Sequence, residues 1–370
     1  MHSDLLYRVA LTLVPGIGPL IAKTLTEELG SAEKVFVVKT KELEGLPGVR
    51  KALSQSLQEN KDEVLKRSEK EIQFIVKHNI KTLFYQEDDY PNRLKTCDDA
   101  PYMLFYKGCC SLNHSKIISV VGSRKNTEYG AFLTHQLIKD LQEYSILVVS
   151  GLAYGIDGEA HKACLENQLD TVGVLGHGLD TIYPAQHRGL AAKMVERGGL
   201  LTEFLSETKP DYQNFPKRNR IVAGMCDATI VIESAAKGGS LITADISHSY
   251  GREVFAFPGR TNDKMSAGCN QLIKSQKAIM IENAQDLIKS MGWEGGKKEK
   301  QLQLSLDKFS DPEQKILSLI SAQNSIHIDV LSINTGLSLP QLKNHLFQLE
   351  MKGVIKNIPG NRVQLMEIVF

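Results

Sequence analysis

Seven short apolar runs, most of them rich in β-branched residues, recur along the middle of the chain and alternate with amphipathic stretches. The runs are KIISVVG (116–122), SILVVSG (145–151), TVGVLG (171–176), GLLTEF (199–204), DATIVIES (227–234), EVFAFPG (253–259) and KAIMIE (277–282). Continuous apolar strands that alternate with helices predict a mostly parallel sheet covered on both faces. We therefore expect a doubly wound, Rossmann-like α/β domain over residues 113–290, with a ligand site at the carboxyl ends of its strands.

The first eighty residues show a different, helical periodicity. In ALTLVPGIGPLIAKTLTEELG (10–30), apolar residues recur at helical spacing on both sides of Pro15-Gly16-Ile17-Gly18, and LEGLPGVRKALSQSL (43–57) is a shorter echo. The pattern predicts a helical domain over residues 1–80 and resembles a helix-hairpin-helix/SAM-like pair. Such a glycine turn either presents backbone N–H groups to DNA phosphate or serves helix packing alone. Residues 81–112, with turn signals at 90–92 and 100–101, are expected to be a connecting segment.

After residue 290 the pattern changes again. Residues 291–310 are charged and contain glycine, which is typical of a linker. Residues 311–370 predict three short helices and then two strands about Pro359-Gly360-Asn361, the order of a winged helix. The expected recognition helix carries Lys343, His345 and Lys352 but no arginine, so a role in docking a protein is as compatible with it as base reading.

Composition restricts where a polyanion can bind. The chain has 44 Lys+Arg against 43 Asp+Glu, so a site for nucleic acid must be local. No stretch has the composition of a signal peptide or a membrane span, and we expect none. The six cysteines include no C-x-x-C pair, which favours reduced thiols in a cytoplasmic protein.

Small and polar residues follow the predicted strands, and they indicate an anion cradle. They are Gly122, Ser123 and Arg124 after the first run, Ser150 and Gly151 after the second, and Gly239 and Ser240 after the fifth. Unpaired N–H groups and helix dipoles at one sheet edge both favour phosphate. Thr127 is the expected cap of the helix that follows the first loop.

The stretch NFPKRNRIVAGM (214–225) gathers cations beside an aromatic ring. Lys217 and Arg218 are expected to contact phosphate from a cationic loop, with Phe215 and Asn219 beside them. Arg220 either joins them or pairs with Glu203 or Asp227 inside the fold. Arg124 either binds phosphate or pairs with Glu128, one helical turn away.

Other ligand chemistries find little support. The first turn, GSRKNTEYG, is not the G-x-G-x-x-G of a dinucleotide enzyme, and no P-loop occurs. No His/Cys/Asp cluster has metal-ligand spacing, so we expect no metal and no cofactor. Asp157 and His161 share a helix face, either as an acid–base pair or as a capping Asp that orients a buried His. His177 is expected to be a loop residue, not a ligand.

Six motifs in order, VVGSR, SGLAYGIDGEAH, GHGLDTIYP, FPKRNRIVAG, GGSLITA and REVFAFPG, resemble the DNA-processing protein A family (DprA/Smf). The resemblance covers the α/β domain, and flanking helical and winged-helix domains also occur in the family. It implies single-stranded DNA binding without sequence preference, a homodimer formed through the Rossmann-like domain, and loading of the RecA recombinase during natural transformation. Its DNA pocket carries over onto Gly122, Ser123, Arg124, Phe215, Lys217, Arg218 and Asn219. Gly238 stands where the family usually has Ser, so no contact is assigned to position 238.

A second hypothesis is a nucleotide-processing hydrolase, because related α/β folds cleave nucleotide glycosidic bonds at this sheet edge. Those enzymes resemble one another in a PGGxGT loop that is followed by a catalytic Glu. Here the region reads AAKGGSLITA, and Asp245 is its only acidic residue. We therefore expect no catalytic residues and a DNA-binding protein, not an enzyme.

Overall fold

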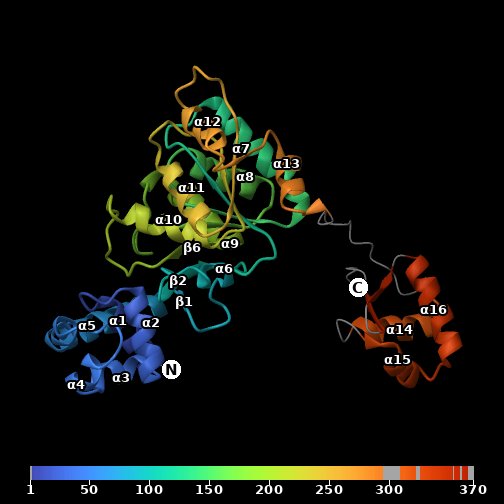
Figure 1. Ribbon diagram of the computed structural model, residues 1–370, viewed down its shortest axis with the longest axis horizontal. Helices are drawn as coiled ribbons and strands as arrows, with labels where there is room; N and C mark the ends of the chain where they lie inside the picture. Colours follow the sequence, from blue (N-terminus) through green and yellow to red (C-terminus); the bar gives the residue numbers. More distant parts are fainter. Residues whose placement is uncertain (1, 295–308, 322–325, 353, 359–360, 366–370) are drawn as a thin grey trace. The chain divides into compact units, whose positions relative to one another are not determined.

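The computed structural model describes residues 2–294, 309–321, 326–352, 354–358 and 361–365. The chain divides into two compact units, Met1–Gly295 and Gly296–Phe370. Figure 1 shows the helical N-terminal elements and the sheet domain of the first unit, and the small second unit. None of the helices in these ranges combines the length and the apolar content needed to cross a membrane.

The first unit is built on a mixed sheet whose described strands follow the order β1-β2-β6-β5-β4-β3-β7-β8-β9. The strands are β1 (Lys81–Phe84), β2 (Met103–Gly108), β3 (Ile117–Val121), β4 (Leu147–Ser150), β5 (Thr171–Val174), β6 (Gly199–Thr202), β7 (Ala228–Val231), β8 (Glu253–Ala256) and β9 (Ile279–Met280). Strands β3 to β9 pair in parallel. All seven predicted runs are strands, and the prediction of a doubly wound, mostly parallel sheet is confirmed.

The prediction that residues 81–112 only connect two domains is wrong. This segment supplies β1 and β2, which pair antiparallel with each other, and β2 pairs antiparallel with β6. The antiparallel pairing of these two strands depends on tertiary contacts that sequence periodicity does not report. The predicted domain boundaries at residues 80 and 290 both lie inside the first compact unit, so they stay predictions.

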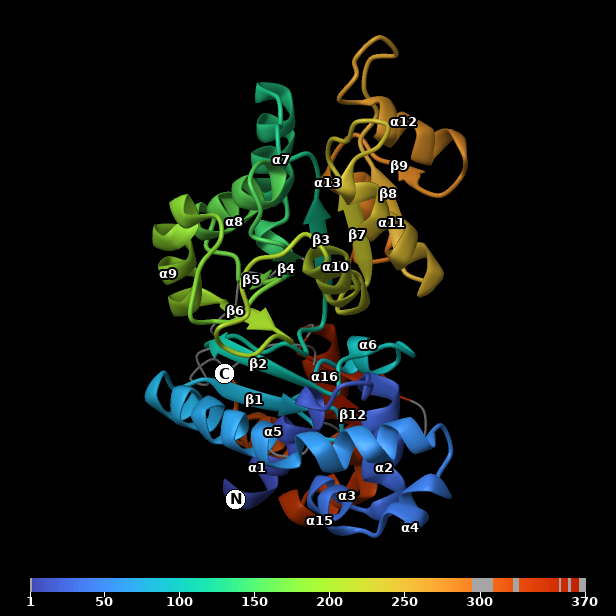
Figure 2. The ribbon, with the colours of Figure 1, turned by 90° about the vertical axis from the view of Figure 1, so that its left-hand side faces the viewer.

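Helices cover both faces of the parallel sheet because alternate strand residues point to opposite sides. Ile118 and Val120 pack in one core with α7 (Glu128–Asp140), α8 (Ile156–Glu166) and α13 (Ala284–Ser290). Ile117 and Val121 belong to the other core, with α10 (Asn214–Gly224), α11 (Gly239–Ser249) and α12 (Ala267–Lys274). The short α6 (Asn92–Lys95) and α9 (Arg188–Arg197) complete the helix layers. Figure 2 shows β3 and β7 between these two layers.

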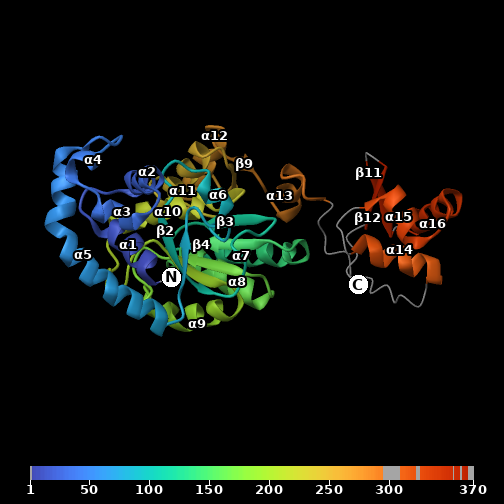
Figure 3. The same ribbon diagram turned by 90° about the horizontal axis from the view of Figure 1, so that it is seen from below.

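The N-terminal elements are helical, as predicted. They are α1 (His2–Leu13), α2 (Pro19–Leu29), α3 (Ala32–Val37), α4 (Thr40–Glu44) and α5 (Lys51–Lys77), which is the long helix of this group in Figure 3. Gly16 has a φ of +88°, and Gly18 is the N-cap of α2, so the predicted glycine turn joins α1 and α2. Val9, Leu25 and Phe84 belong to one continuous core, so the helices pack on the β1–β2 edge of the sheet.

The second unit contains α14 (Asp311–Ser321), β10 (Ile326–His327), α15 (Ile328–Thr335), α16 (Leu339–Met351), β11 (Ile355–Ile358) and β12 (Arg362–Leu365). Its strands follow the order β10-β12-β11 and are antiparallel. Ile316, Leu331, Leu346 and Val363 are buried in its core. The predicted winged helix is confirmed, with β10 as a strand the sequence did not suggest; the predicted turn residues 359–360 lie outside the described ranges.

Candidate functional site

A cavity of about 350 Å³ lies at the carboxyl ends of the central strands. The chain leaves β3 toward β4 on one side and later returns to β7 on the other, so β3 is the point where the strand order reverses. At such a point the loops diverge and open a crevice. Residues that follow β3, β4, β6 and β7 line the cavity, as the sheet-edge prediction requires.

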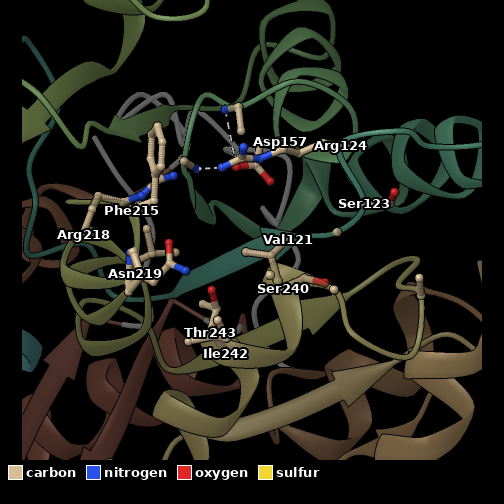
Figure 4. A pocket seen from close by; sticks show the side chains of 18 of the residues that line it. Val121, Ser123, Arg124, Asp157, Phe215, Arg218, Asn219, Ser240, Ile242 and Thr243 are labelled. Carbon is tan, nitrogen blue, oxygen red and sulfur yellow. Dashed lines mark hydrogen bonds between the residues drawn. The ribbon is translucent and has the colours of Figure 1, made fainter. Parts of the chain in front are cut away.

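Helix α10 forms one wall of this cavity. Phe215, Arg218, Asn219 and Val222 line it, whereas Lys217 does not. Figure 4 shows Phe215, Arg218 and Asn219 around the same space as Ser240, Ile242 and Thr243 of α11. The prediction of a cationic loop is wrong, because the stretch is helical from Asn214. Within this helix Arg218 lines the cavity and Lys217 does not, so the two cations do not share one wall.

Arg218 is held in place from inside the fold. Its side chain is buried, and Nη1 donates a hydrogen bond of 2.6 Å to the carbonyl oxygen of Val174, at the end of β5. Nε has no hydrogen-bond partner among the described residues. Burial lowers the pKa of Arg218 to about 10, with Asp157 opposing and Arg124 adding to the shift. The guanidinium is therefore charged at neutral pH and retains donors for an anion.

Asp157 orders the loop that follows β4. Its Oδ2 accepts hydrogen bonds from the backbone N–H of Gly151 (3.1 Å) and Ala153 (3.4 Å). Burial raises the pKa of this carboxyl group, and Arg218 counters the effect. His161 is buried, as expected, but its Nδ1 lies 2.7 Å from Oγ1 of Thr171. The prediction that Asp157 orients His161 is therefore wrong, and the two do not form an acid–base pair.

The loop after β3 places Arg124 over the ring of Phe215, with its guanidinium carbon 4.9 Å from the ring centroid. Arg124 forms no ion pair with Glu128 in the described part of the chain. Thr127 caps α7 by accepting a hydrogen bond from the N–H of Gly130, as predicted. The Glu233 carboxylate accepts hydrogen bonds of 2.9 Å from both the N–H and the hydroxyl of Thr127.

Glu233 was missed by the sequence reasoning. It is buried after β7, and its carbonyl oxygen also accepts a hydrogen bond from the N–H of Ser123. The sequence contains one indication of its role, because an acidic residue ends an otherwise apolar strand run. A buried carboxylate needs donors, and the nearby loop supplies them.

The predicted serine ligands behave differently from one another. The hydroxyl of Ser150 is buried and donates to the carbonyl oxygen of Val120 at 2.6 Å, so Ser150 is part of the sheet and not of the cavity lining. Ser240 lines the cavity, but its hydroxyl donates to Ser234. Gly239 and Ser240 begin α11, where the first backbone N–H groups have no intrahelical acceptor. Helix N–H groups are therefore the anion donors available on this side.

Some of the remaining predicted residues line the cavity and others do not. Gly122, Ser123, Gly151 and Gly239 line the cavity, in agreement with the cradle predicted at the strand ends. Arg220 bonds to the Glu203 carboxylate and to the carbonyl oxygen of Asp99, so the fold holds it. His177 accepts a hydrogen bond from the N–H of Tyr183, as a loop residue.

Two lining features were not predicted. Tyr212 lines the cavity and is 84% exposed, so its ring is available to a ligand. A Cβ at Gly238 would lie 2.2 Å from the hydroxyl oxygen of Ser234, so a serine at this position would require Ser234 to move.

Comparison with known proteins places the chain among DNA-processing proteins. A family model described as DNA recombination-mediator protein A matches residues 81–292, and one described as the DprA winged helix domain matches residues 300–361. Protein Smf of Escherichia coli (strain K12) is 35% identical over 288 residues, which cover 75% of each chain. Protein Smf of Synechocystis sp. is 30% identical over 408 aligned positions, which cover 98% of this chain and 99% of that protein.

Two solved structures agree with this result. The structure of DNA processing protein A from Streptococcus pneumoniae matches with a TM-score of 0.66 and 32% identity, and the match covers 76% of this chain and 95% of that one. The structure of DNA processing protein A from Helicobacter pylori, described for its single-stranded DNA binding mode, matches with a TM-score of 0.52 and 27% identity. That match covers 57% of this chain and 95% of the Helicobacter chain.

Proposed function

The chain belongs to the DNA recombination-mediator protein A family, and on that premise we propose that it binds single-stranded DNA without sequence preference in the cavity at the sheet edge. The observation that carries the proposal is the shared cavity of Phe215, Arg124 and Arg218. Binding of single strands irrespective of sequence needs a cationic track and a ring on which a base can stack. The start of α11 adds backbone N–H donors, which favour phosphate.

In this proposal Phe215 stacks on a base, and Arg124 and Arg218 neutralise phosphates. Arg218 contributes a fixed charge because its contact with Val174 removes the rotamer freedom that an exposed arginine would lose on binding. The exposed ring of Tyr212 offers a second stacking surface at the rim. Gly122 and Gly151 make room inside the fold, because a Cβ at Gly122 would meet Ile156 and a Cβ at Gly151 would meet Arg218.

We further propose that two copies associate through the Rossmann-like domain and that the DNA-bound form loads the RecA recombinase during natural transformation. The description of the family as recombination mediators supports the second part. Light scattering after size-exclusion chromatography tests the dimer. Faster nucleation of RecA on single strands in the presence of the protein tests the loading.

The six cysteines of the chain are free thiols, which supports action in the cytoplasm.

The proposed role is binding and not catalysis. Asp157 is the only carboxylate among the described residues that line the cavity, and its Oδ2 is engaged by two backbone N–H groups. A nucleotide hydrolase would need a free acid or base beside the substrate.

Fluorescence anisotropy with a labelled dT oligomer, run against duplex DNA and mononucleotides, tests the proposal. If about four phosphates are neutralised, the log–log salt dependence of the affinity has a slope near −3, from about −0.7 for each phosphate. Arg124→Ala should weaken oligomer binding and flatten this slope by about one phosphate. Unchanged affinity in Arg124→Ala would overturn the site, and turnover of a nucleoside monophosphate by the unaltered protein would favour the hydrolase.

A further inference from the structure

A second cavity, of about 430 Å³, lies on the other side of α10. Lys217 and Arg220 line it from α10, Gly18 from the turn between α1 and α2, Tyr102 from the segment before β2, and Glu203 and Phe204 from the loop after β6. All these residues belong to the first compact unit. The helical N-terminal elements and the sheet therefore both contribute to this cavity.

Helix α10 divides its cations between the two cavities. Phe215, Arg218 and Asn219 recur at a spacing of three and four residues and face the first cavity, whereas Lys217 and Arg220 lie three apart and face the second. One helix is thus the common wall of both. A DNA strand bound in the first cavity would reach the second cavity by crossing this helix.

The two cations that line the second cavity from α10 differ in whether they have hydrogen-bond partners. Arg220 is bonded to Glu203 and to the carbonyl oxygen of Asp99. Lys217 is exposed and forms no hydrogen bond or ion pair with any residue in the described ranges. Lys217 is therefore the cation of this cavity that an incoming phosphate can use.

The interior of the cavity is suited to a planar, hydrogen-bond-donating group. Phe204 supplies aromatic surface and Pro19 adds an apolar contact, whereas the Tyr102 ring is buried against Phe84. Oε1 of Glu203 is buried and accepts no hydrogen bond from the described residues, although Oε2 is bonded to Arg220. A buried acceptor without a donor is costly, and an exocyclic amine of a base supplies such a donor.

We propose that this second cavity binds a further nucleotide of the single strand held in the first cavity, with its base inside and its phosphate at Lys217. The inference rests on the proposed function, because it extends the same DNA path. The N-terminal helices then belong to the DNA-binding surface through Gly18 and Pro19, which begin α2 without a side-chain cap. The donor requirement of Glu203 favours cytosine or adenine over thymine at this one position.

The test compares the length of the oligomer with the site of the substitution. Labelled dC oligomers of about four and about twelve nucleotides are titrated with the unaltered protein, with Lys217→Ala and with Phe215→Ala. We expect Lys217→Ala to weaken binding of the long oligomer about 3- to 10-fold and to reduce its salt slope by about 0.7, with the short oligomer unaffected. Phe215→Ala should weaken both. Lys193→Ala, an exposed lysine of α9, is the matched charge control and should change neither.

The outcomes separate the two proposals. If Lys217→Ala leaves the long oligomer unchanged, or weakens both lengths equally, the second cavity is not the continuation of the path. If the unaltered protein binds neither oligomer, or Phe215→Ala has no effect, the proposed function itself fails. Glu203→Gln keeps an acceptor for Arg220 but presents an amide donor in place of Oε1. It should reduce the preference for dC over dT in long oligomers, and an unchanged preference would remove Glu203 from the base contact.

Discussion

The guanidinium of Arg124 lies over the ring of Phe215, 4.9 Å from its centroid, although Arg124 belongs to the loop after β3 and Phe215 to helix α10. A cation over an aromatic face is attracted to it, so each side chain orients the other. The pair presents a positive charge and a π surface side by side. A single nucleotide needs both, one for its phosphate and one for its base.

Removal of the Phe215 ring should weaken single-strand binding without changing its salt dependence. One stacked base contributes about 1–3 kcal/mol, so Phe215→Ala is expected to reduce affinity about 5- to 150-fold. Anisotropy titration at several salt concentrations measures both quantities. Phe215→Tyr retains the ring and should bind nearly as the unaltered protein does. A flattened salt slope in Phe215→Ala would show that the ring acts by holding Arg124, not by stacking.

Two glycines of the cavity lining should respond differently to alanine. A Cβ at Gly151 would lie 1.9 Å from Nη1 of Arg218, whereas a Cβ at Gly239 has no atom within 4 Å. Gly151→Ala must displace a buried arginine, so we expect a loss of about 1–3 kcal/mol of stability and weaker DNA binding. Gly239→Ala should keep both, or gain about 0.4–1 kcal/mol of stability. Denaturant unfolding and anisotropy check the pair, and equal behaviour would contradict the position of Arg218.

Glu233 should act on DNA binding through the loop that carries Arg124. Glu233→Ala leaves the N–H and the hydroxyl of Thr127 without their acceptor, which we expect to cost about 1–3 kcal/mol. The loop between Ser123 and Thr127 then loses its anchor, and oligomer affinity should fall. Glu233→Gln retains one acceptor oxygen and should recover most of both losses. If DNA affinity is unchanged in Glu233→Ala, the loop does not depend on this carboxylate.

His161 should make the fold sensitive to acid. Burial lowers the pKa of His161 from 6.5 to about 3, and the neighbouring His187 adds to the effect. Below pH 6.5 the unfolded chain binds a proton that the folded chain refuses, so the stabilisation is complete above pH 6.5 and is lost toward pH 3. The limiting slope is about 1.4 kcal/mol for each pH unit.

Thermal unfolding of the unaltered protein and of His161→Gln, compared between pH 7 and pH 4, measures this contribution. The variant should be less stable at pH 7, because the hydrogen bond with Thr171 is altered, but should lose less stability on acidification. Parallel pH profiles of the two proteins would contradict the burial of a neutral His161.

Much of the fold could be predicted from local sequence patterns. The parallel strands were identified because a strand buried on both faces is continuously apolar, and helices between such runs require the doubly wound arrangement. Thr127 was identified as a helix cap because its side chain acts on its own local backbone. β1 and β2 were missed, since β1 pairs with β2 and β2 pairs with distant β6, and neither pairing is a local property of the sequence.

At the site, the kinds of residue present could be predicted from the sequence: glycines and an arginine after β3, cations beside Phe215, and a helix start after β7. Which of these residues meet depends on the three-dimensional fold. It turned Arg218 inward and Lys217 outward on one helix, placed Arg220 on Glu203, and buried the Ser150 hydroxyl in the sheet. The reason is physical. Strand and helix periods are local properties of the chain, whereas the direction of a side chain depends on the phase of its helix against neighbours that are remote in sequence.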